Sequence, residues 1–317
     1  MADIEVGNIA AFPRSTLMMM EPRALESFTT LMGRLIRGAE HMPKRSAEPS
    51  TSTRSQAKSI AVIPIIGVME NRATMFSDWY GGIGTDRIGA AFDAAVMDDR
   101  VKSILMLWDT PGGMVYGTPE LAKKIYDARG VKPIVSLAEH MAASAGYYAA
   151  SAAHRLYVSP SADVGSVGVY QMHVDYSNAM EAEGVKVTFI KAGAHKVEGN
   201  PYEPLSQDAL DYIQGDVNDI YDQFVADVAK HRSVSKADVL ANFGEGRTLN
   251  AKRAVAAGMA DGIATFDQVV ARLHAGKINT AGAAANDDWE SPVVMEDSES
   301  FGTAEWAERK LSLRMRG

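Results

Sequence analysis

Strand-length apolar segments alternate with amphipathic helices along most of this chain of 317 residues. Three of these segments, residues 60–66, 103–108 and 134–138, are almost continuously apolar. A strand has this composition when both of its faces are buried, which is typical of a parallel sheet covered by helices on both sides. The sequence therefore predicts an α/β fold with a largely parallel sheet and covering helices.

Cap residues and helical spacing indicate where the helices lie. Thr85 and Thr118 are candidate N-caps, and Pro119 suits the first turn of the second helix. Hydrophobic residues at steps of three and four from Leu210 to Val228 predict a long amphipathic helix. Further strands are predicted at 156–158, 167–172 and 185–190, and further helices at 143–153, after caps Ser235 and Asn250, and at 266–274.

The two ends of the chain differ in composition from its centre. Residues 43–58 are rich in Ser, Thr, Pro and charge, so they predict a linker. The apolar cluster Leu17–Met20 is interpreted as one side of a short helix that runs to about Ile36. We expect an N-terminal extension and linker at 1–58, a folded domain at 59–275 and a flexible or partner-binding tail at 276–317.

Charge and composition exclude several classes of function. The net charge of −8 disfavours general nucleic-acid binding. The chain has no cysteine, which excludes disulfides, thiolate metal sites and cysteine nucleophiles. It also has no apolar stretch near the roughly 20 residues of a membrane helix, and acidic residues stand near its start. We expect a cytoplasmic protein without a membrane anchor.

Two segments that follow predicted strands could carry chemistry. In an α/β sheet, reactive groups gather at the carboxyl ends of strands. Gly113, in Pro111-Gly112-Gly113, could direct its N–H toward a developing oxyanion, although the segment could equally be a plain turn. Ser144 lies in A-x-S-x-G, similar to a nucleophile elbow, although small residues there could serve only close packing.

A serine nucleophile needs a base at neutral pH. None of the seven histidines stands in an arrangement that indicates a triad. A lysine can act as the base if burial lowers its pKa by about three units, which costs about 4 kcal/mol. Lys196 is a candidate, because it follows a strand predicted to be buried and lies in a loop of Gly and Ala.

Four motifs together resemble one family. They are DTPGGMV (109–115), AASAGYYAASAA (142–153), GSVGV (165–169) and GAHKVEGNPY (193–202). In this order they resemble the signal peptide peptidase A family of Ser-Lys proteases, and more closely its phage branch, the lambda-type capsid maturation proteases. The string HKVEGNPY and the segment EPRALESF are the phage-like features, and the expected absence of a membrane anchor agrees with that branch.

The resemblance implies a fold and a set of roles. It implies a Clp-protease/crotonase-like fold, with Ser144 as nucleophile and Lys196 as general base. Ser166 would orient the lysine, and the N–H groups of Gly113 and Ala145 would form the oxyanion hole. Neither a metal nor an organic cofactor is implied. A homo-oligomer is implied, in which neighbouring protomers could share the active site.

The resemblance also implies a biological role. The chain would be a serine endopeptidase that processes scaffold and capsid or portal proteins inside the assembling prohead, in the host cytoplasm. The small residues Thr280–Ala285 would suit self-trimming. Three alternatives stay open: a soluble bacterial peptidase similar to signal peptide peptidase, a catalytically idle scaffold protein of capsid assembly, and a crotonase-like acyl-CoA enzyme.

Overall fold

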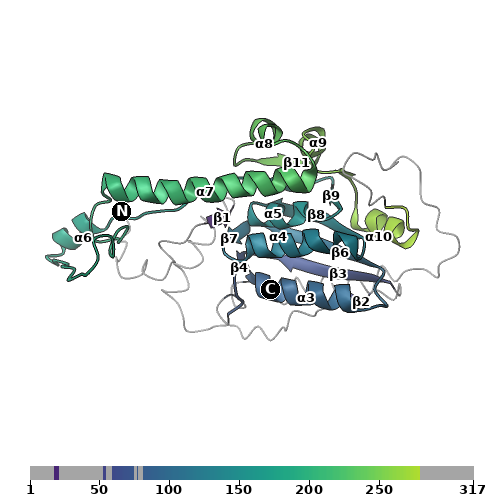
Figure 1. The fold of residues 1–317 in the computed structure, drawn as a ribbon, viewed down its shortest axis with the longest axis horizontal. Coiled ribbons are helices and arrows are strands. Elements are labelled where there is room, and N and C mark those ends of the chain that lie inside the picture. The colour runs from purple at the N-terminus through teal and green to yellow at the C-terminus, as the bar shows by residue number, and fades with distance from the viewer. Residues whose placement is uncertain (1–17, 21–52, 55–58, 75–76, 78–80, 279–317) are drawn as a thin grey trace.

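A mostly parallel β-sheet forms the centre of the molecule (Figure 1). The structure is a computed structural model that describes residues 18–20, 53–54, 59–74, 77 and 81–278. The strands of the main sheet are β2 (Thr53–Arg54), β3 (Ile60–Ile66), β6 (Ser103–Thr110), β8 (Ile134–Ala143), β9 (Arg155–Val158), β10 (Asp163–Gly165), β11 (Thr248–Asn250) and β12 (Gly262–Ile263). Their order is β11-β10-β8-β6-β3-β2, and β9 pairs with both β8 and β12. Only the β2 and β11 edges are antiparallel.

A second, smaller sheet stands at the carboxyl ends of the central strands. Its strands are β1 (Met18–Met20), β4 (Met69–Glu70), β5 (Ile83–Gly84) and β7 (Gly112–Met114). The order is β1-β7-β4-β5, with β1 antiparallel to β7. Because β4 and β7 follow β3 and β6 after only one or two residues, the small sheet continues directly from the main one.

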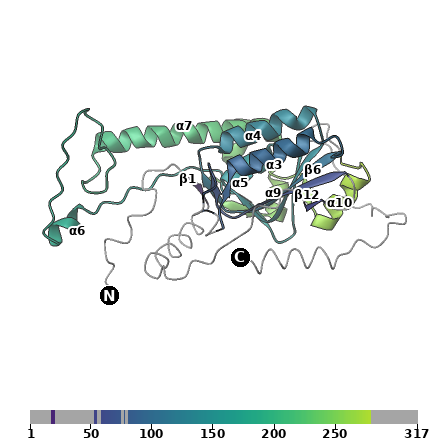
Figure 2. The same cartoon turned by 90° about the horizontal axis from the view of Figure 1, so that it is seen from below.

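Helices cover both faces of the main sheet (Figures 1 and 2). They are α3 (Thr85–Met97), α4 (Thr118–Asp127), α5 (Ala145–Ser151), α6 (Ser177–Ala182), α7 (Gln207–Arg232), α8 (Lys236–Asn242), α9 (Ala251–Ala256) and α10 (Phe266–His274). One 3-10 turn, Ala128–Gly130, follows α4. No helix within the described ranges combines the length and the apolar character that a membrane span requires.

The packing of β3 on both of its faces explains its continuously apolar sequence. Ala61, Ile63 and Ile65 pack in the cluster that contains residues of α3, α4 and α5. Ile60 and Val62 point to the opposite cluster, where they pack with Val269 of α10. Successive side chains of a strand alternate between its faces, so burial on both sides requires an unbroken apolar run. The predicted α/β class, parallel sheet and covering helices are thereby confirmed.

Several local predictions are confirmed, and the helix starts at two sites are wrong by one residue. Ser235 and Asn250 cap α8 and α9 through their side chains. Gly84 and Gly117, not Thr85 and Thr118, hold the N-cap positions of α3 and α4. The two threonine hydroxyls instead donate to the carbonyl oxygens of Asn71 and Met114, both at 3.0 Å. These bonds fasten the helix starts to the small sheet.

Two predicted strands are wrong. In 167–172 only Tyr170 makes an isolated bridge, and the strand lies earlier, at β10. Residues 185–190 form no strand, and Val185, Val187 and Ile190 are exposed. A β-branched apolar segment becomes a strand only where another strand pairs with it, and this segment lies outside both sheets.

The predicted helix at Leu17–Ile36 is wrong where it can be tested. Met18–Met20 form strand β1, and all three side chains are buried. Leu17 and residues 21–36 lie outside the described residues, as do residues 43–52 and 55–58 of the predicted linker and residues 279–317 of the tail, which include Thr280–Ala285. Thr53–Arg54, at the end of that linker, pairs with β3.

Helix α7 joins the sheet to a projecting arm (Figures 1 and 2). Its C-terminal third carries the buried residues Phe224, Val225 and Val228, which pack in the main core. Its N-terminal part extends beyond the sheet, where Leu210 and Tyr212 are exposed. Residues 171–206, with α6 at the far end, form the arm that leads into this helix.

Candidate active site

Three chain segments meet at the carboxyl end of the main sheet. Thr110, at the end of β6, is paired with Ala142 of β8, and Ala143 is paired with Gly165 of β10. Parallel strands end at the same edge of a sheet, so the residues that follow these pairs lie close together. Those residues include Gly112, Ser144 and Ser166, which the sequence places in three separate motifs.

Ser144 stands at the junction of β8 and α5. Its backbone has φ 54° and ψ −117°, a region that residues other than glycine rarely adopt. Its N–H donates to the carbonyl oxygen of Gly165 at 2.6 Å, which fixes the turn. The side chain is 1% exposed, and within the described residues its Oγ has no hydrogen-bond partner. A buried hydroxyl without a partner costs stability, so this serine is not there to stabilise the fold.

The glycines around Ser144 are steric requirements. A Cβ on Gly112, which has φ 95°, would lie 2.9 Å from the Cβ of Ser144. A Cβ on Gly146 would lie 2.4 Å from Cγ2 of Thr110, and one on Gly113 would lie 1.9 Å from the carbonyl oxygen of Met69. The P-G-G and S-A-G motifs therefore allow two backbone segments to approach the serine closely.

Ser166 begins the segment that follows β10. It has φ 53°, and its N–H donates to the carbonyl oxygen of Arg247 at 2.8 Å. Gly165, which accepts the Ser144 N–H, immediately precedes it. The structure thus brings four sequence-predicted residues to one end of the sheet, namely Gly113, Ser144, Ala145 and Ser166.

Lys196 does not join this group. It is exposed, as are all residues from Lys191 to Lys196, and they form turns on the projecting arm. The expected buried strand before the lysine is absent there, so the chain itself supplies no pocket for the amine. The structure therefore separates the candidate nucleophile from the candidate base within one protomer.

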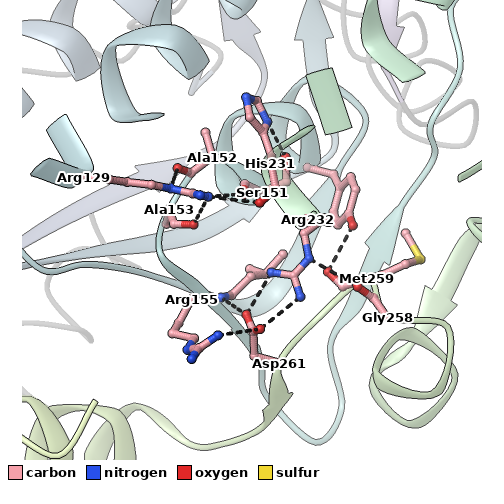
Figure 3. Close-up of polar contacts among 12 residues, drawn as sticks. Arg129, Ser151, Ala152, Ala153, Arg155, His231, Arg232, Gly258, Met259 and Asp261 are labelled. Carbon is pink, nitrogen blue, oxygen red and sulfur yellow. Dashed lines mark hydrogen bonds and ion pairs between the residues drawn. The ribbon is translucent and has the colours of Figure 1, made fainter. Parts of the chain in front are cut away.

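The far end of the serine helix α5 is held by a half-buried arginine (Figure 3). The Arg129 guanidinium donates to the carbonyl oxygens of Ser151, Ala152 and Ala153 and, at 3.2 Å, to that of His231. The first three of these carbonyls lie at or just beyond the end of α5, where carbonyls have no partner within the helix, so a cation there is favourable. Burial lowers the pKa of Arg129 to about 10, which leaves it charged at neutral pH.

A second cluster fixes the C-terminal end of α7 (Figure 3). Arg232 forms two hydrogen bonds to the Asp261 carboxylate, at 2.8 and 3.1 Å. Asp261 also lies 3.4 Å from Nη1 of Arg155 and accepts the N–H of Leu156 at 2.7 Å. All three charged side chains are almost fully buried. The cluster ties α7 to β9 and to the segment before β12.

Contacts between aromatic rings connect α5 to α7. Tyr148 stacks on Phe224 with ring centroids 4.6 Å apart, and its hydroxyl donates to Asp227. The Ser151 hydroxyl and Nδ1 of His231 are 3.0 Å apart. Burial, with neighbouring cations as a smaller cause, lowers the pKa of His231 to about 3, so this imidazole is neutral. The anchored end of α7 and the serine helix therefore form one packed unit.

Sequence reasoning missed this anchoring cluster and the strand β1 at the site. The side-chain contacts of this cluster join residues 22 to 106 positions apart, and no short motif connects Arg129, Arg155, Arg232 and Asp261. The methionines of β1 carry no period that distinguishes a strand from a helix. Their place beside β7 is visible only in the structure.

One group of metal-ligand residues lies on the arm. His195, Glu198 and Asp208 are close enough together to hold an ion, and all three are exposed. The Glu198 carboxylate hydrogen-bonds Nδ1 of His195 and raises the pKa of that imidazole. Within the part of the chain that the structure describes this is the only such group, and exposed ion pairs commonly have this form.

One family model matches a segment of the chain that includes Ser144. Residues 127–279 match the model of Peptidase family S49. The matched segment is just under half of the chain and includes Ser144, Ser166 and Lys196.

Two phage proteins are among its most similar relatives. The chain is 37% identical over 202 residues to "Capsid assembly protease C" of Escherichia phage lambda, covering 64% of this chain and 46% of that protein. It is 33% identical over 202 residues to "Head-tail preconnector protein GP5" of Enterobacteria phage P21, covering 64% of this chain and 40% of that protein. The chain thus matches less than half the length of each phage relative.

A bacterial protein is also similar. "Putative signal peptide peptidase SppA" of Enterococcus faecium is 31% identical over 167 residues, which cover 52% of this chain and 48% of that protein. The bacterial match is shorter and less identical than the two phage matches.

Proposed function

We propose that this protein is a serine endopeptidase with a Ser-Lys dyad, in which Ser144 is the nucleophile and Lys196 the general base. The observation that carries the proposal is the Ser144 hydroxyl, buried and without a partner in the described part, at a backbone turn with positive φ. A peptidase S49 domain around that serine supports the same role. Strained residues cluster at functional sites because the surrounding structure has to hold them in place.

The chemistry uses groups of the chain alone. A neutral Lys196 amine takes the proton of the Ser144 hydroxyl as its oxygen bonds to the scissile carbonyl carbon. The N–H groups of Gly113 and Ala145 stabilise the oxyanion, and Ala145 suits this role because the first N–H of α5 has no partner within the helix. The lysine then gives the proton to the leaving amine, and water hydrolyses the acyl-enzyme. Ser166 orients the lysine amine.

A second copy of the chain completes the dyad in this proposal. A lysine base has to be neutral, and an exposed amine keeps its charge at neutral pH. Since Lys196 is exposed on the arm, burial against a neighbouring protomer would supply the desolvation. The exposed apolar residues of the arm and of the projecting part of α7, among them Ile190, Leu210 and Tyr212, support such a contact.

The proposed protease domain spans 59–275. Strand β3 begins at Ile60 and α10 ends at His274, close to these bounds. Residues 1–58 are proposed as an N-terminal extension and linker, although β1 and β2 from this part pair with strands of the domain. Residues 276–317 are proposed as a tail, with self-trimming at Thr280–Ala285.

We propose phage head maturation as the role, with scaffold and capsid or portal proteins as substrates. The names of the lambda and P21 relatives, a capsid assembly protease and a head-tail preconnector protein, support this setting. Their longer and more identical matches favour it over a bacterial signal-peptide peptidase. The protein would act inside the prohead, in the host cytoplasm.

Co-expression with the scaffold protein of the same phage tests the proposal. The unmodified protein should cleave the scaffold, and Ser144→Ala and Lys196→Ala should each abolish cleavage, as measured by intact-mass spectrometry. Lys191→Ala is the matched control, because Lys191 is exposed on the same arm. Undiminished cleavage by either of the first two variants would reject the dyad.

A further inference from the structure

Strand β1 lies where an extended peptide would have to bind to reach Ser144. Met18, Met19 and Met20 are antiparallel to β7 and pair with Met114, Gly113 and Gly112, respectively. On its other side, Met18 exchanges both backbone hydrogen bonds with Tyr170, at 3.0 and 3.1 Å. The strand is therefore enclosed between β7 and the segment that follows Ser166.

The register directs the backbone of Met19 toward the proposed oxyanion hole. The N–H and C=O of Met18 point to Tyr170, and these groups alternate sides along a strand. Those of Met19 therefore face Gly113. In agreement, a Cβ on Gly112 would lie 2.2 Å from the carbonyl oxygen of Met19 and 2.9 Å from the Cβ of Ser144. A peptide carbonyl of this chain thus occupies the neighbourhood of the serine.

The side chains of β1 fill the remaining space. The exposed fractions of Met18, Met19 and Met20 are 6%, 0% and 2%. Methionine is long, flexible and apolar, so it fills irregular pockets well. A substrate segment cannot pair with the same edge of β7 while these residues are in place, because each strand edge accepts one partner.

We propose that Met18–Met20 is an internal occupant of the peptide-binding groove, which a substrate has to displace. This inference rests on the proposed function, since it identifies β7 as the edge that binds substrate. The occupied state is latent, and release of β1 opens the groove. The groove then accepts an extended segment with long, unbranched apolar side chains, the chemistry of its present occupant.

A disulfide tests whether β1 occupies the groove in solution. Met18 and Met114 are a pair without mutual hydrogen bonds, because the backbone of Met18 bonds Tyr170. Such pairs have Cα atoms about 4.5 Å apart, within the range of a disulfide. The natural chain has no cysteine, so Met18→Cys with Met114→Cys provides the only two thiols.

Mild oxidation should convert this double variant to an intramolecular disulfide, seen as the loss of both free thiols with a monomer band on a non-reducing gel. The control is Met97→Cys with Met114→Cys, because Met97 is 80% exposed at the end of α3. The control should keep its thiols. Failure of the first pair to form the disulfide would overturn the occupancy.

Peptide binding tests whether the occupant blocks the groove. The probe is a fluorescein-labelled peptide with the sequence of residues 15–23, STLMMMEPR, measured by fluorescence polarisation with Ser144→Ala proteins. The oxidised double-cysteine variant should not bind it. The Met18→Asp/Met20→Asp variant should bind the peptide at least about tenfold more tightly than the protein with the natural β1, since buried carboxylates disfavour docking of β1. Met97→Asp is the matched control and should leave binding unchanged.

These measurements separate the inference from the proposed function. Equal binding by the oxidised and reduced double-cysteine variants would overturn the inference, whether or not the protein cleaves anything. If binding follows the expected order but the same variants with Ser144 intact cleave no peptide, the occupant is supported and the protease proposal fails. Binding and cleavage that both increase when β1 is released would support the two together.

Discussion

The serine end of the molecule and the lysine arm differ in how strongly the chain fixes them. Ser144 is buried, and paired strands, two close glycines and a helix capped by Arg129 hold it in place. Lys196 lies on an arm whose residues 191–196 are all exposed. One protomer therefore holds the proposed nucleophile in place but leaves the proposed base in solvent. Under the proposed function, this difference would make the chemistry depend on assembly rather than on folding of one chain.

A mixture of two inactive variants should give the largest effect and tests whether two protomers share one site. Ser144→Ala and Lys196→Ala should each lower peptidase activity by at least about 10³-fold. A one-to-one mixture should recover about a quarter of the unmodified activity, because random assembly puts an intact serine beside a neighbour's intact lysine in that share of sites. The measurement is the initial rate of peptide hydrolysis after co-refolding or subunit exchange.

The control for this mixture is each variant mixed with Ser144→Ala/Lys196→Ala protein, which should stay inactive. Activity lost by both single variants but never recovered in their mixture would place the dyad within one protomer. The exposed arm would then have to fold back onto its own sheet.

The anchored end of α7 should show the largest effect on stability. Asp261→Ala leaves the charges of Arg232 and Arg155 buried without their carboxylate. Loss of one member of a buried ion pair costs about 3–5 kcal/mol. Urea unfolding should show that decrease in the free energy of unfolding.

Asp127→Ala is the matched control, since Asp127 pairs with Lys123 on the exposed surface of α4. Exposed pairs of this kind contribute at most about 1 kcal/mol. Equal effects of the two substitutions would mean that the buried cluster does not anchor α7.

The same two regions show what sequence could and could not reveal. Strands β3, β6 and β8 were predictable because burial on both faces leaves an unbroken apolar run in each. Ser144 and Gly113 were predictable because short motifs at strand ends carry them. The arm was not, since residues 185–190 have the composition of a strand but no neighbour in the sheets. Composition shows that a segment is able to form a strand, whereas the strand forms only where a distant part of the chain pairs with it.

Glycine substitutions near the serine and on the projecting part of α7 should change stability in opposite directions. In Gly146→Ala the new Cβ would meet Cγ2 of Thr110 at 2.4 Å, and overpacking of this kind costs about 1–3 kcal/mol. Adding Thr110→Ser should restore the lost stability, because serine removes that methyl but keeps the hydroxyl that donates to the carbonyl oxygen of Gly67.

Gly215→Ala, on the projecting part of α7, is the contrasting substitution. The new Cβ meets no atom within 4 Å and should stabilise the helix by up to about 1 kcal/mol. Thermal unfolding of all three variants measures these effects, and a destabilised Gly215→Ala protein would show that this face of α7 is covered.

A difference in pH dependence is expected between a histidine of the body and one of the arm. Burial lowers the pKa of His231 to about 3, whereas its unfolded value is near 6.5. Between these values the unfolded chain binds the extra proton, so His231 lowers stability as the pH falls below 6.5, by about 1.4 kcal/mol per pH unit. His231→Gln should flatten this acid slope when urea midpoints are compared at pH 7.5 and 5.5.

The contribution of His195, on the arm, to stability changes with pH in the opposite direction. Glu198 raises the pKa of His195, so the favourable contribution is lost as the pH rises through the folded value. His195→Gln is therefore the control that should leave the acid slope in place, and an equal flattening by both substitutions would show that burial of His231 is not its cause.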